Sequence, residues 1–305
     1  MHIRHRPKNM EDVLGNKPTK KAIEGLLYDR PILLEGTRGC GKTTIALILA
    51  NKFVESENNI RVINCRHESQ VANMRDTVDS FRKSSIFGNK KAYIFDEIHQ
   101  LSPASQGELL AELEDSLPKD VLIVACTTTT KGMDVPLLER FIRLPIKPLN
   151  MKDSLILLDR ISSLEEINLP KWLSALICEK AEGIPRNILT SLAKVRNIDN
   201  PEEAEYLIEL SKLEDIDEGV LTLFKIIRNE DWFRIRGTLE SCLRNNKPEI
   251  IRVGLLNLIG ARLMSKYLTN KEEASRLLKH YNVLSENRFP EKANLIYTVC
   301  KCTME

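Results

Sequence analysis

The sequence predicts an α/β protein in which a parallel sheet with helices on both faces is followed by helical domains. Short apolar runs alternate with helical patterns up to about residue 148, which is typical of parallel strands joined by helical crossovers. After Pro145, Pro148 and Asn150, apolar residues recur only with helical spacing. A glycine-rich loop separates the first apolar run from the next helical pattern, as expected for a strand, a turn and a helix that bind phosphate.

Each expected element rests on its apolar pattern. The five apolar runs predict strands near residues 32–35, 60–64, 92–96, 121–126 and 142–145. Between them, helices are expected near residues 18–28, 42–54, 69–82 and 103–115. In the second half of the chain, helical periodicity covers residues 155–161, 172–178, 188–195, 220–227, 251–263 and 293–299.

Two breaks divide the chain into three expected domains. The first break is the proline-rich segment near Asn150, and the second is an acidic, weakly periodic segment between residues 200 and 217. We therefore expect an α/β domain over residues 1–149, a helical domain over residues 150–214 and a second helical domain over residues 215–305.

The loop over residues 36–43 fits the pattern G-x-x-x-x-G-K-[ST]. Its backbone N–H groups can surround phosphate oxygens, Lys42 can reach the β and γ phosphates, and the Thr43 hydroxyl can hold Mg²⁺. The preceding strand and the following helix favour this interpretation over a glycine-rich turn without a ligand. The nucleotide-binding residues expected here are Gly36, Thr37, Arg38, Gly39, Cys40, Gly41, Lys42, Thr43 and Thr44.

Two adjacent acids end the expected strand at residues 92–96. Asp96 can hold Mg²⁺ through water, and Glu97 can orient and deprotonate the water that attacks the γ phosphate. An exposed turn after a strand is the alternative interpretation. The paired acids predict hydrolysis as well as binding, with ATP and Mg²⁺ as the cofactors, whereas the lone His99 is interpreted as structural.

Composition and charge bear on the class of protein. No apolar run reaches the length of a membrane span, and the basic N-terminus lacks the apolar stretch of a secretory signal, so we expect a cytoplasmic protein without a membrane partner. The seven cysteines are odd in number and lack paired C-x-x-C spacing, so they indicate neither a disulfide framework nor a zinc site. A formal net charge of +2 does not by itself indicate a nucleic-acid partner.

With these motifs, the chain resembles the AAA+ ATPases and, among them, the clamp-loader subunits that place ring-shaped sliding clamps on DNA. The resemblance covers most of the first 200 residues and implies that the two helical domains are a lid and an oligomerising collar. Residues 6–15 resemble the N-terminal box of the family, which implies that Val13 and Leu14 flank adenine. The strand at residues 121–126 resembles the sensor 1 strand, which implies that Thr127 or Thr128 helps to position the attacking water; ordinary strand threonines are the alternative.

Two arginines complete the resemblance. Residues 137–141 are similar to the Ser-Arg-Cys segment of clamp loaders, which implies that Arg140 enters the site of a neighbouring subunit, although the flanking residues of that segment are replaced here. Residues 183–186 resemble sensor 2, which implies that Arg186 contacts the γ phosphate. A guanidinium fork suits the charge that develops on the γ oxygens in the transition state. A surface ion pair is the alternative for each arginine.

A second branch of the family shares some of these motifs. Residues 96–103 and the lid motif also resemble the bacterial motor that drives Holliday-junction branch migration. That motor inserts a long β hairpin before sensor 1, and residues 115–120 leave no room for one. Residues 201–305 carry 16 Lys and Arg against 17 Asp and Glu, which suits a helical collar better than a basic DNA-binding domain.

We therefore expect an ATP-hydrolysing subunit of a sliding-clamp loader that acts in DNA replication. The branch-migration motor and a regulatory or non-hydrolysing AAA+ scaffold subunit are the alternative interpretations. The compact chain, which lacks a four-cysteine zinc module, resembles a phage clamp-loader subunit or a replication factor C small subunit. A bacterial cell or a phage-infected host is the expected setting.

The resemblance also implies partners: a sliding clamp, primer-template DNA and other subunits in a homo- or hetero-oligomeric ring, expected to be a pentamer. Arg75, Arg82 and Lys83 fall in a region that lines the inner surface of clamp loaders, so we expect them to contact DNA phosphates; a solvated charged face is the alternative. Ile86 and Phe87 interrupt a polar segment in a region that faces the clamp. We expect them to anchor the clamp, and burial under the preceding helix is the alternative.

Overall fold

A computed structural model describes most of the chain. The described residues are 1, 3–66, 71–83, 90–114, 117–201, 204–205, 207–208, 218–227, 232–265, 268, 270–286 and 291–304. The predicted clamp anchors, Ile86 and Phe87, lie outside these ranges.

Packing divides the chain into two compact units. One unit comprises Met1–Asn168 and Ala181–Thr190, and the other comprises Leu169–Lys180 and Ser191–Glu305. The boundaries of the three expected domains stay a prediction.

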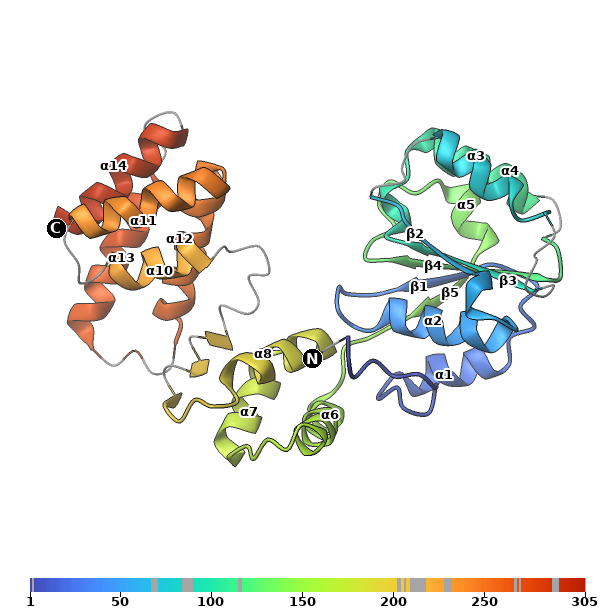
Figure 1. The fold of residues 1–305 in the computed structure, drawn as a ribbon, viewed down its shortest axis with the longest axis horizontal. Coiled ribbons are helices and arrows are strands. Elements are labelled where there is room, and N and C mark those ends of the chain that lie inside the picture. Colours follow the sequence, from blue (N-terminus) through green and yellow to red (C-terminus); the bar gives the residue numbers. More distant parts are fainter. Residues whose placement is uncertain are drawn as a thin grey trace. The chain divides into compact units, whose positions relative to one another are not determined.

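A parallel sheet of five strands forms the centre of the first unit (Figure 1). The strands run in the spatial order β2-β3-β4-β1-β5, and all neighbouring strands are parallel. Their bounds are β1 (Ile32–Glu35), β2 (Ile60–Asn64), β3 (Lys91–Asp96), β4 (Val121–Thr127) and β5 (Ile142–Pro145). The predicted parallel sheet is confirmed, and each strand begins and ends within one residue of its expected position.

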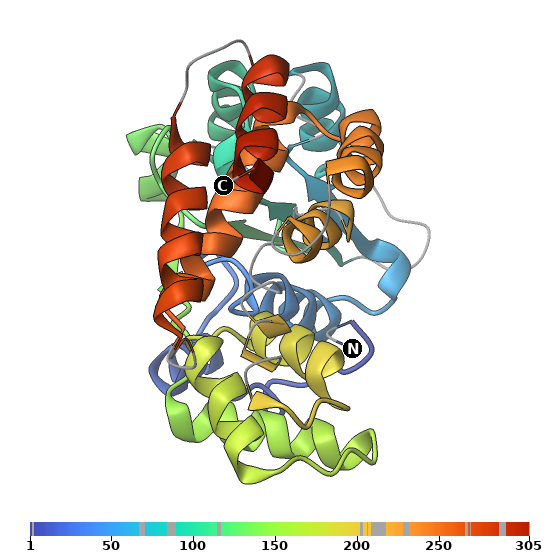
Figure 2. The same cartoon turned by 90° about the vertical axis from the view of Figure 1, so that its left-hand side faces the viewer.

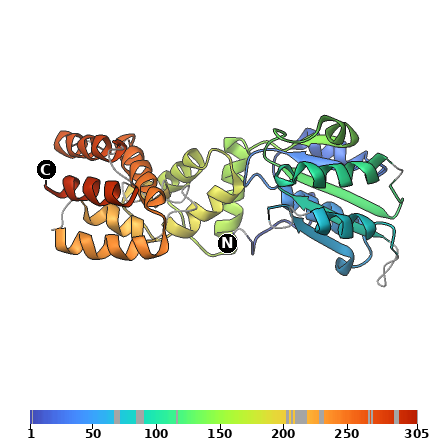
Figure 3. The same ribbon diagram turned by 90° about the horizontal axis from the view of Figure 1, so that it is seen from above.

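Helices cover both faces of this sheet. They are α1 (Lys17–Glu24), α2 (Lys42–Phe53), α3 (Val71–Asp79), α4 (Pro103–Glu114) and α5 (Val135–Arg140). Apolar residues of α1 and α2 pack on one face of the strands, and those of α3, α4 and α5 pack on the other. Figure 3 looks onto the face that α3 and α4 cover. The short helix α5 is additional to the helices expected from the sequence.

Three helices follow the sheet: α6 (Met151–Leu164), α7 (Lys171–Lys180) and α8 (Pro185–Val195). Asn150, which marks the predicted break, caps the first of them, because its side-chain oxygen accepts a hydrogen bond of 2.8 Å from the backbone N–H of Asp153. Gly183, just before α8, has a φ of +72°, and a Cβ atom there would lie 2.0 Å from the carbonyl oxygen of Leu149. This glycine therefore permits the backbone contact in which Leu149 N–H donates to the Gly183 carbonyl at 2.7 Å.

The C-terminal helices form a separate apolar core. They are α10 (Glu218–Ile226), α11 (Trp232–Asn245), α12 (Pro248–Leu263), α13 (Lys271–Ser285) and α14 (Glu291–Met304). α12, α13 and α14 pack against one another (Figure 2), with Leu255, Leu284 and Val299 fully buried among them. No helix within the described ranges is long and apolar enough to cross a membrane.

Candidate nucleotide-binding site

A pocket of about 340 Å³ opens at the carboxyl ends of the central strands. Parallel α/β sheets bind ligands at this edge, beside the point where the strand order reverses. The pocket is lined by the N-terminal segment, the glycine-rich loop, the ends of β2 and β3, and residues of α6 and α8: His5, Arg6, Pro7, Asp12, Val13, Leu14, residues 38–45, Asn64, Arg66, Asp96, Glu97, Leu149, Leu157, Pro185, Arg186 and Leu189. Most of the predicted nucleotide-binding residues therefore meet in one place.

The glycine-rich loop requires three of its glycines. Gly39 and Gly41 have φ values of +83° and +98°, in the left-handed region that side chains disfavour. At Gly36 a Cβ atom would lie 2.1 Å from the carbonyl oxygen of Ile146. Gly41 is the N-cap of α2, so the helix directs its first N–H groups at the loop, as an anion site requires.

Lys42 is held inside this loop. Its ammonium group donates to the carbonyl oxygens of Gly36 at 2.8 Å and Thr37 at 3.1 Å, and only 6% of the residue is exposed. These carbonyls keep the side chain folded over the loop, where the phosphates of a nucleotide are expected. The loop therefore presents both backbone N–H groups and a positive charge to an anion.

The two predicted metal ligands lie side by side. The Thr43 hydroxyl is 3.2 Å from Oδ2 and 3.4 Å from Oδ1 of Asp96, which ends β3. Hydroxyl and carboxylate oxygens are the ligands that Mg²⁺ prefers. The pair therefore fits Mg²⁺ held together with nucleotide phosphates, although no cluster of three or more His, Cys, Asp or Glu side chains able to hold a metal by itself occurs among the described residues.

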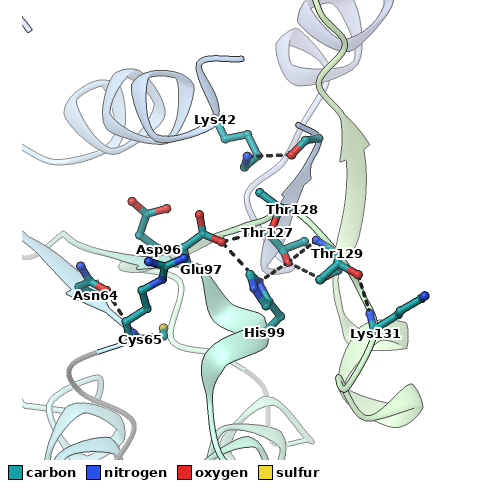
Figure 4. Close-up of polar contacts among 12 residues, drawn as sticks. Lys42, Asn64, Cys65, Asp96, Glu97, His99, Thr127, Thr128, Thr129 and Lys131 are labelled. Atoms are coloured by element: carbon teal, nitrogen blue, oxygen red, sulfur yellow. Dashed lines mark hydrogen bonds and ion pairs between the residues drawn. The ribbon is translucent and has the colours of Figure 1, made fainter. Parts of the chain in front are cut away.

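Glu97 follows in an unusual backbone conformation, with a φ of +56°. Such strain in a residue other than glycine is concentrated at functional sites. The Oε2 atom of Glu97 lies 3.5 Å from the hydroxyl of Thr128 (Figure 4). The neighbouring Thr127 is fully buried, and its hydroxyl donates to the carbonyl oxygen of Thr129. Of the two threonines predicted for sensor 1, Thr128 is therefore the one beside Glu97.

Arg186 lines the pocket from the start of α8. Its backbone N–H donates to the carbonyl of Gly39 at 3.4 Å, and a Cβ atom on Gly39 would lie 3.1 Å from the Cβ of Arg186. The second residue of α8 thus packs directly on the phosphate loop. This contact places the predicted sensor 2 arginine at the same pocket as Lys42.

The N-terminal segment contributes Val13 and Leu14, the predicted adenine contacts, to the lining of the pocket. The ammonium group of Lys20 donates to the Val13 carbonyl at 2.8 Å. Nearby, Glu165 accepts hydrogen bonds from His5 and, at 2.9 Å, from Arg4. The bond from His5, followed by the bond from Arg4, lowers the pKa of the Glu165 carboxyl below its usual value. These contacts attach the N-terminal segment to the end of α6.

Arg140 lies outside the pocket of its own chain, at the end of α5. About half of its side chain is exposed, and its Nη2 atom lies 3.7 Å from Oε1 of Glu114. Arg30 donates to the backbone carbonyls of Glu139 and Arg140, at 2.8 and 3.2 Å. The arginine is therefore fixed at its backbone and open to solvent at its tip.

The predicted DNA-contacting arginines are paired with acids of α4. The Nη2 atom of Arg75 lies 2.7 Å from Oε1 of Glu108, and the Nε atom of Arg82 lies 2.7 Å from Oε1 of Glu112. Both arginine side chains remain more than half exposed. Lys83 is exposed, and its carbonyl accepts a hydrogen bond from the buried Lys91.

Cys40 and Cys126 are buried beside the site. Burial raises the pKa of both thiols above the usual value. Both side chains are therefore neutral at physiological pH and act as packing groups, since a cysteine nucleophile or metal ligand must be a thiolate.

Other pocket residues were missed among the predicted sites. Asn64 ends β2 and Arg66 follows it, and both line the pocket beside Asp96 and Glu97. Their position at the end of an expected strand could have predicted them, because the carboxyl ends of parallel strands lie at the same edge of the sheet. His5 and Asp12 also line the pocket without having been predicted to do so.

Comparison with known proteins identifies the class of this domain. Residues 32–148, which contain all five strands, match the family described as ATPase family associated with various cellular activities, or AAA. The chain therefore contains an AAA ATPase domain, which implies that it binds a nucleotide.

The chain is also similar to subunits of replication complexes. It is 26% identical over 251 residues to DNA polymerase III subunit gamma of Buchnera aphidicola subsp. Baizongia pistaciae. The matched region covers 74% of this chain and 68% of that protein. It is 23% identical over 231 residues to replication factor C subunit 4 of Encephalitozoon cuniculi, covering 74% of each. The chain spans only 32% of DNA polymerase III subunit tau of Escherichia coli, at 30% identity. These relatives confirm the predicted resemblance to clamp-loader subunits.

Among solved structures, the chain resembles the RuvB Holliday junction branch migration motor of Thermotoga maritima. The TM-score is 0.55 at 23% sequence identity, over 73% of this chain and 79% of that one. A likeness at this identity shows the fold alone. The predicted AAA+ fold is confirmed by it.

Proposed function

We propose that the protein is an ATP-hydrolysing subunit of a sliding-clamp loader, which opens the processivity clamp of a DNA polymerase and places it on primer-template DNA. The observation that carries this proposal is a complete set of hydrolytic groups around one pocket, in a chain related to subunits of DNA polymerase III and replication factor C. Lys42, Thr43, Asp96 and Glu97 form that set. Work on replicating DNA implies the cytoplasm of a bacterial or phage-infected cell.

The residues divide the chemistry among them. Lys42 and the loop N–H groups bind the β and γ phosphates, and Thr43 and Asp96 hold the metal ion. Mg²⁺, when bound with the nucleotide, neutralises charge on the phosphate oxygens. Glu97 accepts a proton from the attacking water. Arg186, which packs on Gly39, supplies a positive charge for the γ phosphate from the same chain.

Arg140 supports assembly into a ring. Arg140 does not line the pocket of its own chain and its side chain is about half exposed, so a neighbouring subunit can receive it. An arginine finger supplied in this way contributes roughly 10³- to 10⁵-fold in rate. Hydrolysis is then fast only in the assembled ring, which we propose to contain this chain with further subunits, as a pentamer.

The branch-migration motor is the second candidate, and it is favoured only by the shared fold. α4 ends at Glu114 and β4 begins at Val121, which leaves no space for a long inserted hairpin. The C-terminal helices α10 to α14 form an apolar helical core. Both features favour the clamp-loader proposal.

The deciding experiment is ATP hydrolysis by the purified chain with candidate clamps, primer-template DNA and a Holliday junction as separate additions. Stimulation by clamp and primer-template DNA together supports the proposal, and stimulation by the junction alone contradicts it. Lys42→Ala should lose ATP binding, whereas Glu97→Gln should bind ATP and hydrolyse it slowly. Binding without any hydrolysis in the wild type, even with all additions, would identify a regulatory or scaffold subunit instead.

A further inference from the structure

His99 lies between the end of β4 and the carboxylate of Glu97. It is the middle residue of the short 3₁₀ helix η2 (Ile98–Gln100), which begins directly after Glu97. Its Nδ1 atom is 3.0 Å from the hydroxyl oxygen of Thr127 and 3.5 Å from Oε2 of Glu97 (Figure 4). Only 11% of the imidazole is exposed. The ring therefore connects Thr127, at the end of β4, to Glu97, the proposed water-activating residue after β3.

The hydrogen bonds of Thr127 determine where the imidazole carries its proton. The hydroxyl of Thr127 has one proton, which it donates to the carbonyl oxygen of Thr129. Its oxygen accepts from the backbone N–H of Thr129 at 3.2 Å, which leaves one lone pair for His99. Because the hydroxyl has no second proton to give, Nδ1 of His99 must be the donor. The ring is thus held with a proton on Nδ1, close to the Glu97 carboxylate.

Two side chains approach the same oxygen of Glu97, and the approach of His99 is the longer branch of a hydrogen bond whose shorter branch goes to Thr127 at 3.0 Å. The Nδ1–H group of His99 and the hydroxyl of Thr128 each lie 3.5 Å from Oε2. Distances of this length are common before substrate binds and shorten in the reacting complex. Within the described ranges no side chain donates to the other oxygen, Oε1, which can therefore accept a proton from water.

The backbone of Glu97 makes such support necessary. Its φ of +56° lies in the left-handed region, which residues other than glycine disfavour. A carboxylate on a strained turn needs partners to keep one direction. His99 follows two residues later, and its own ring is fixed by the buried Thr127, so the support comes from the rigid sheet.

We propose that His99 is a positioning residue for ATP hydrolysis: its single Nδ1–H is shared between Thr127, which fixes the ring, and Oε2 of Glu97, and this shared contact directs Oε1 at the attacking water. The inference rests on the proposed function, because it needs Glu97 to activate water. It also revises the interpretation of His99 from the sequence, which gave the residue a structural role only.

The test uses two amides that place their nitrogen differently. In Asn the amide nitrogen is as far from Cα, counted in bonds, as Nδ1 of His; in Gln it is one bond farther. His99→Asn should therefore keep most of the wild-type kcat, whereas His99→Gln should lose about 100-fold, the scale of a 1 Å misplacement in an active site. ATP affinity should be unchanged in both, because the phosphate loop binds the nucleotide.

A second route avoids any doubt about the histidine variants. Thr127→Val removes the oxygen that fixes the direction of the imidazole ring, and Thr127→Ser keeps it, so only Thr127→Val should lower kcat. If the two residues act as one unit, the double variant of Thr127→Val and His99→Gln should lose no more kcat than the more impaired of the two single variants. Melting temperatures measured on every sample separate loss of folding from loss of positioning.

Several outcomes overturn the inference. Wild-type kcat in His99→Gln, or an equal loss in His99→Asn and His99→Gln, contradicts a role for Nδ1–H. Fully additive losses in the double variant contradict the coupled pair. If the wild type shows no hydrolysis that depends on Glu97, the proposed function fails and the inference fails with it, whereas normal hydrolysis in all His99 and Thr127 variants overturns the inference alone.

Discussion

The hydroxyl of Thr43 lies 3.2 Å from Oδ2 of Asp96, so the second residue of α2 meets the last residue of β3. The two residues are 53 positions apart in the sequence. Their meeting depends on the loop after β1, which starts α2 over the edge of the sheet where β3 ends. The contact forms the proposed metal site from one helix and one strand.

This geometry predicts the effect of removing either oxygen ligand. Asp96→Asn and Thr43→Val should each weaken the apparent Mg²⁺ affinity about 10- to 100-fold, the range seen when groups around a bound metal are removed. Thr43→Ser, which keeps the hydroxyl, is the matched control. The measurement is ATP hydrolysis against Mg²⁺ concentration. An identical Mg²⁺ dependence in Thr43→Val and Thr43→Ser would remove the Thr43 hydroxyl from the metal site.

The centre of the sheet was predictable from the sequence because β1, β3 and β4 are buried on both faces. Such strands appear as continuous apolar runs, and all seven residues of β4 are buried. Two C-terminal helices were missed for the opposite reason. In α11 the buried residues Ile235, Leu239 and Cys242 are separated by charged residues, and in α13 the buried face includes the polar His280. A helix whose core face is sparse gives a weak periodic signal.

The candidate site was predictable where one motif holds all the residues, as in the phosphate loop. It was not predictable where the order of the strands or the direction of a side chain determines which residues reach the site. Adjacent strand residues point to opposite faces, so the sequence left Thr127 and Thr128 as equal candidates, and only the fold puts Thr128 beside Glu97. Asn64 reaches the pocket because β2 pairs with β3, an order that apolar patterns do not give.

The exposed tip of Arg140 predicts a defect that depends on assembly. Arg140→Ala should leave the nucleotide affinity of the isolated chain unchanged, because the arginine lies outside its pocket. In the assembled complex, stimulated hydrolysis should fall by roughly 10³-fold or more. Nucleotide titration of the single chain and steady-state hydrolysis by the complex measure the two effects.

Glu114 supplies the control for this prediction, since it is the acid near the Arg140 guanidinium. Glu114→Gln removes the ion pair and leaves the arginine in place, so stimulated hydrolysis should persist. If Glu114→Gln and Arg140→Ala impair hydrolysis equally, the ion pair is what matters and the arginine has no role in a neighbouring site.

The contact between His5 and Glu165 predicts how stability changes with pH. Hydrogen bonds from His5 and Arg4 lower the pKa of Glu165 in the folded state below its unfolded value of about 4.3. A lowered carboxyl pKa stabilises the fold above the unfolded pKa, and this stabilisation is lost as the pH falls through the folded pKa. Glu165→Gln should therefore lower the melting temperature at pH 7. The difference in melting temperature from the wild type should become smaller as the pH falls below about 4.

The adjacent Glu166, whose side chain is exposed, is the control for this effect. Glu166→Gln should not change the melting temperature at either pH. Thermal unfolding of the three proteins between pH 3 and pH 7 gives the comparison. A Glu165→Gln variant that tracks the wild type at every pH would show that the contact does not stabilise the fold.

The pairing of Arg82 with Glu112 predicts opposite effects of two substitutions on DNA binding. Arg82→Ala removes the proposed phosphate contact, so affinity for DNA should fall and the salt slope should decrease by about 0.7 to 0.9. Glu112→Gln removes the acid that now holds the guanidinium, with Nε 2.7 Å from Oε1, and frees the arginine for phosphate. Its DNA affinity at low salt should therefore rise. Both measurements use primer-template DNA titrated at several salt concentrations.

The Arg236–Glu240 pair of α11 offers a matched control, because its Nε atom lies 2.9 Å from Oε1 and both side chains are exposed. Arg236→Ala and Glu240→Gln carry the same charge changes as Arg82→Ala and Glu112→Gln but lie on a helix for which we predict no DNA contact. Their affinities should shift only slightly, as expected from net charge alone. Equal salt slopes in the wild type and Arg82→Ala, or equal shifts in Arg82→Ala and Arg236→Ala, would indicate a merely solvated face. Opposite shifts confined to Arg82 and Glu112 would support phosphate binding by Arg82, which follows α3.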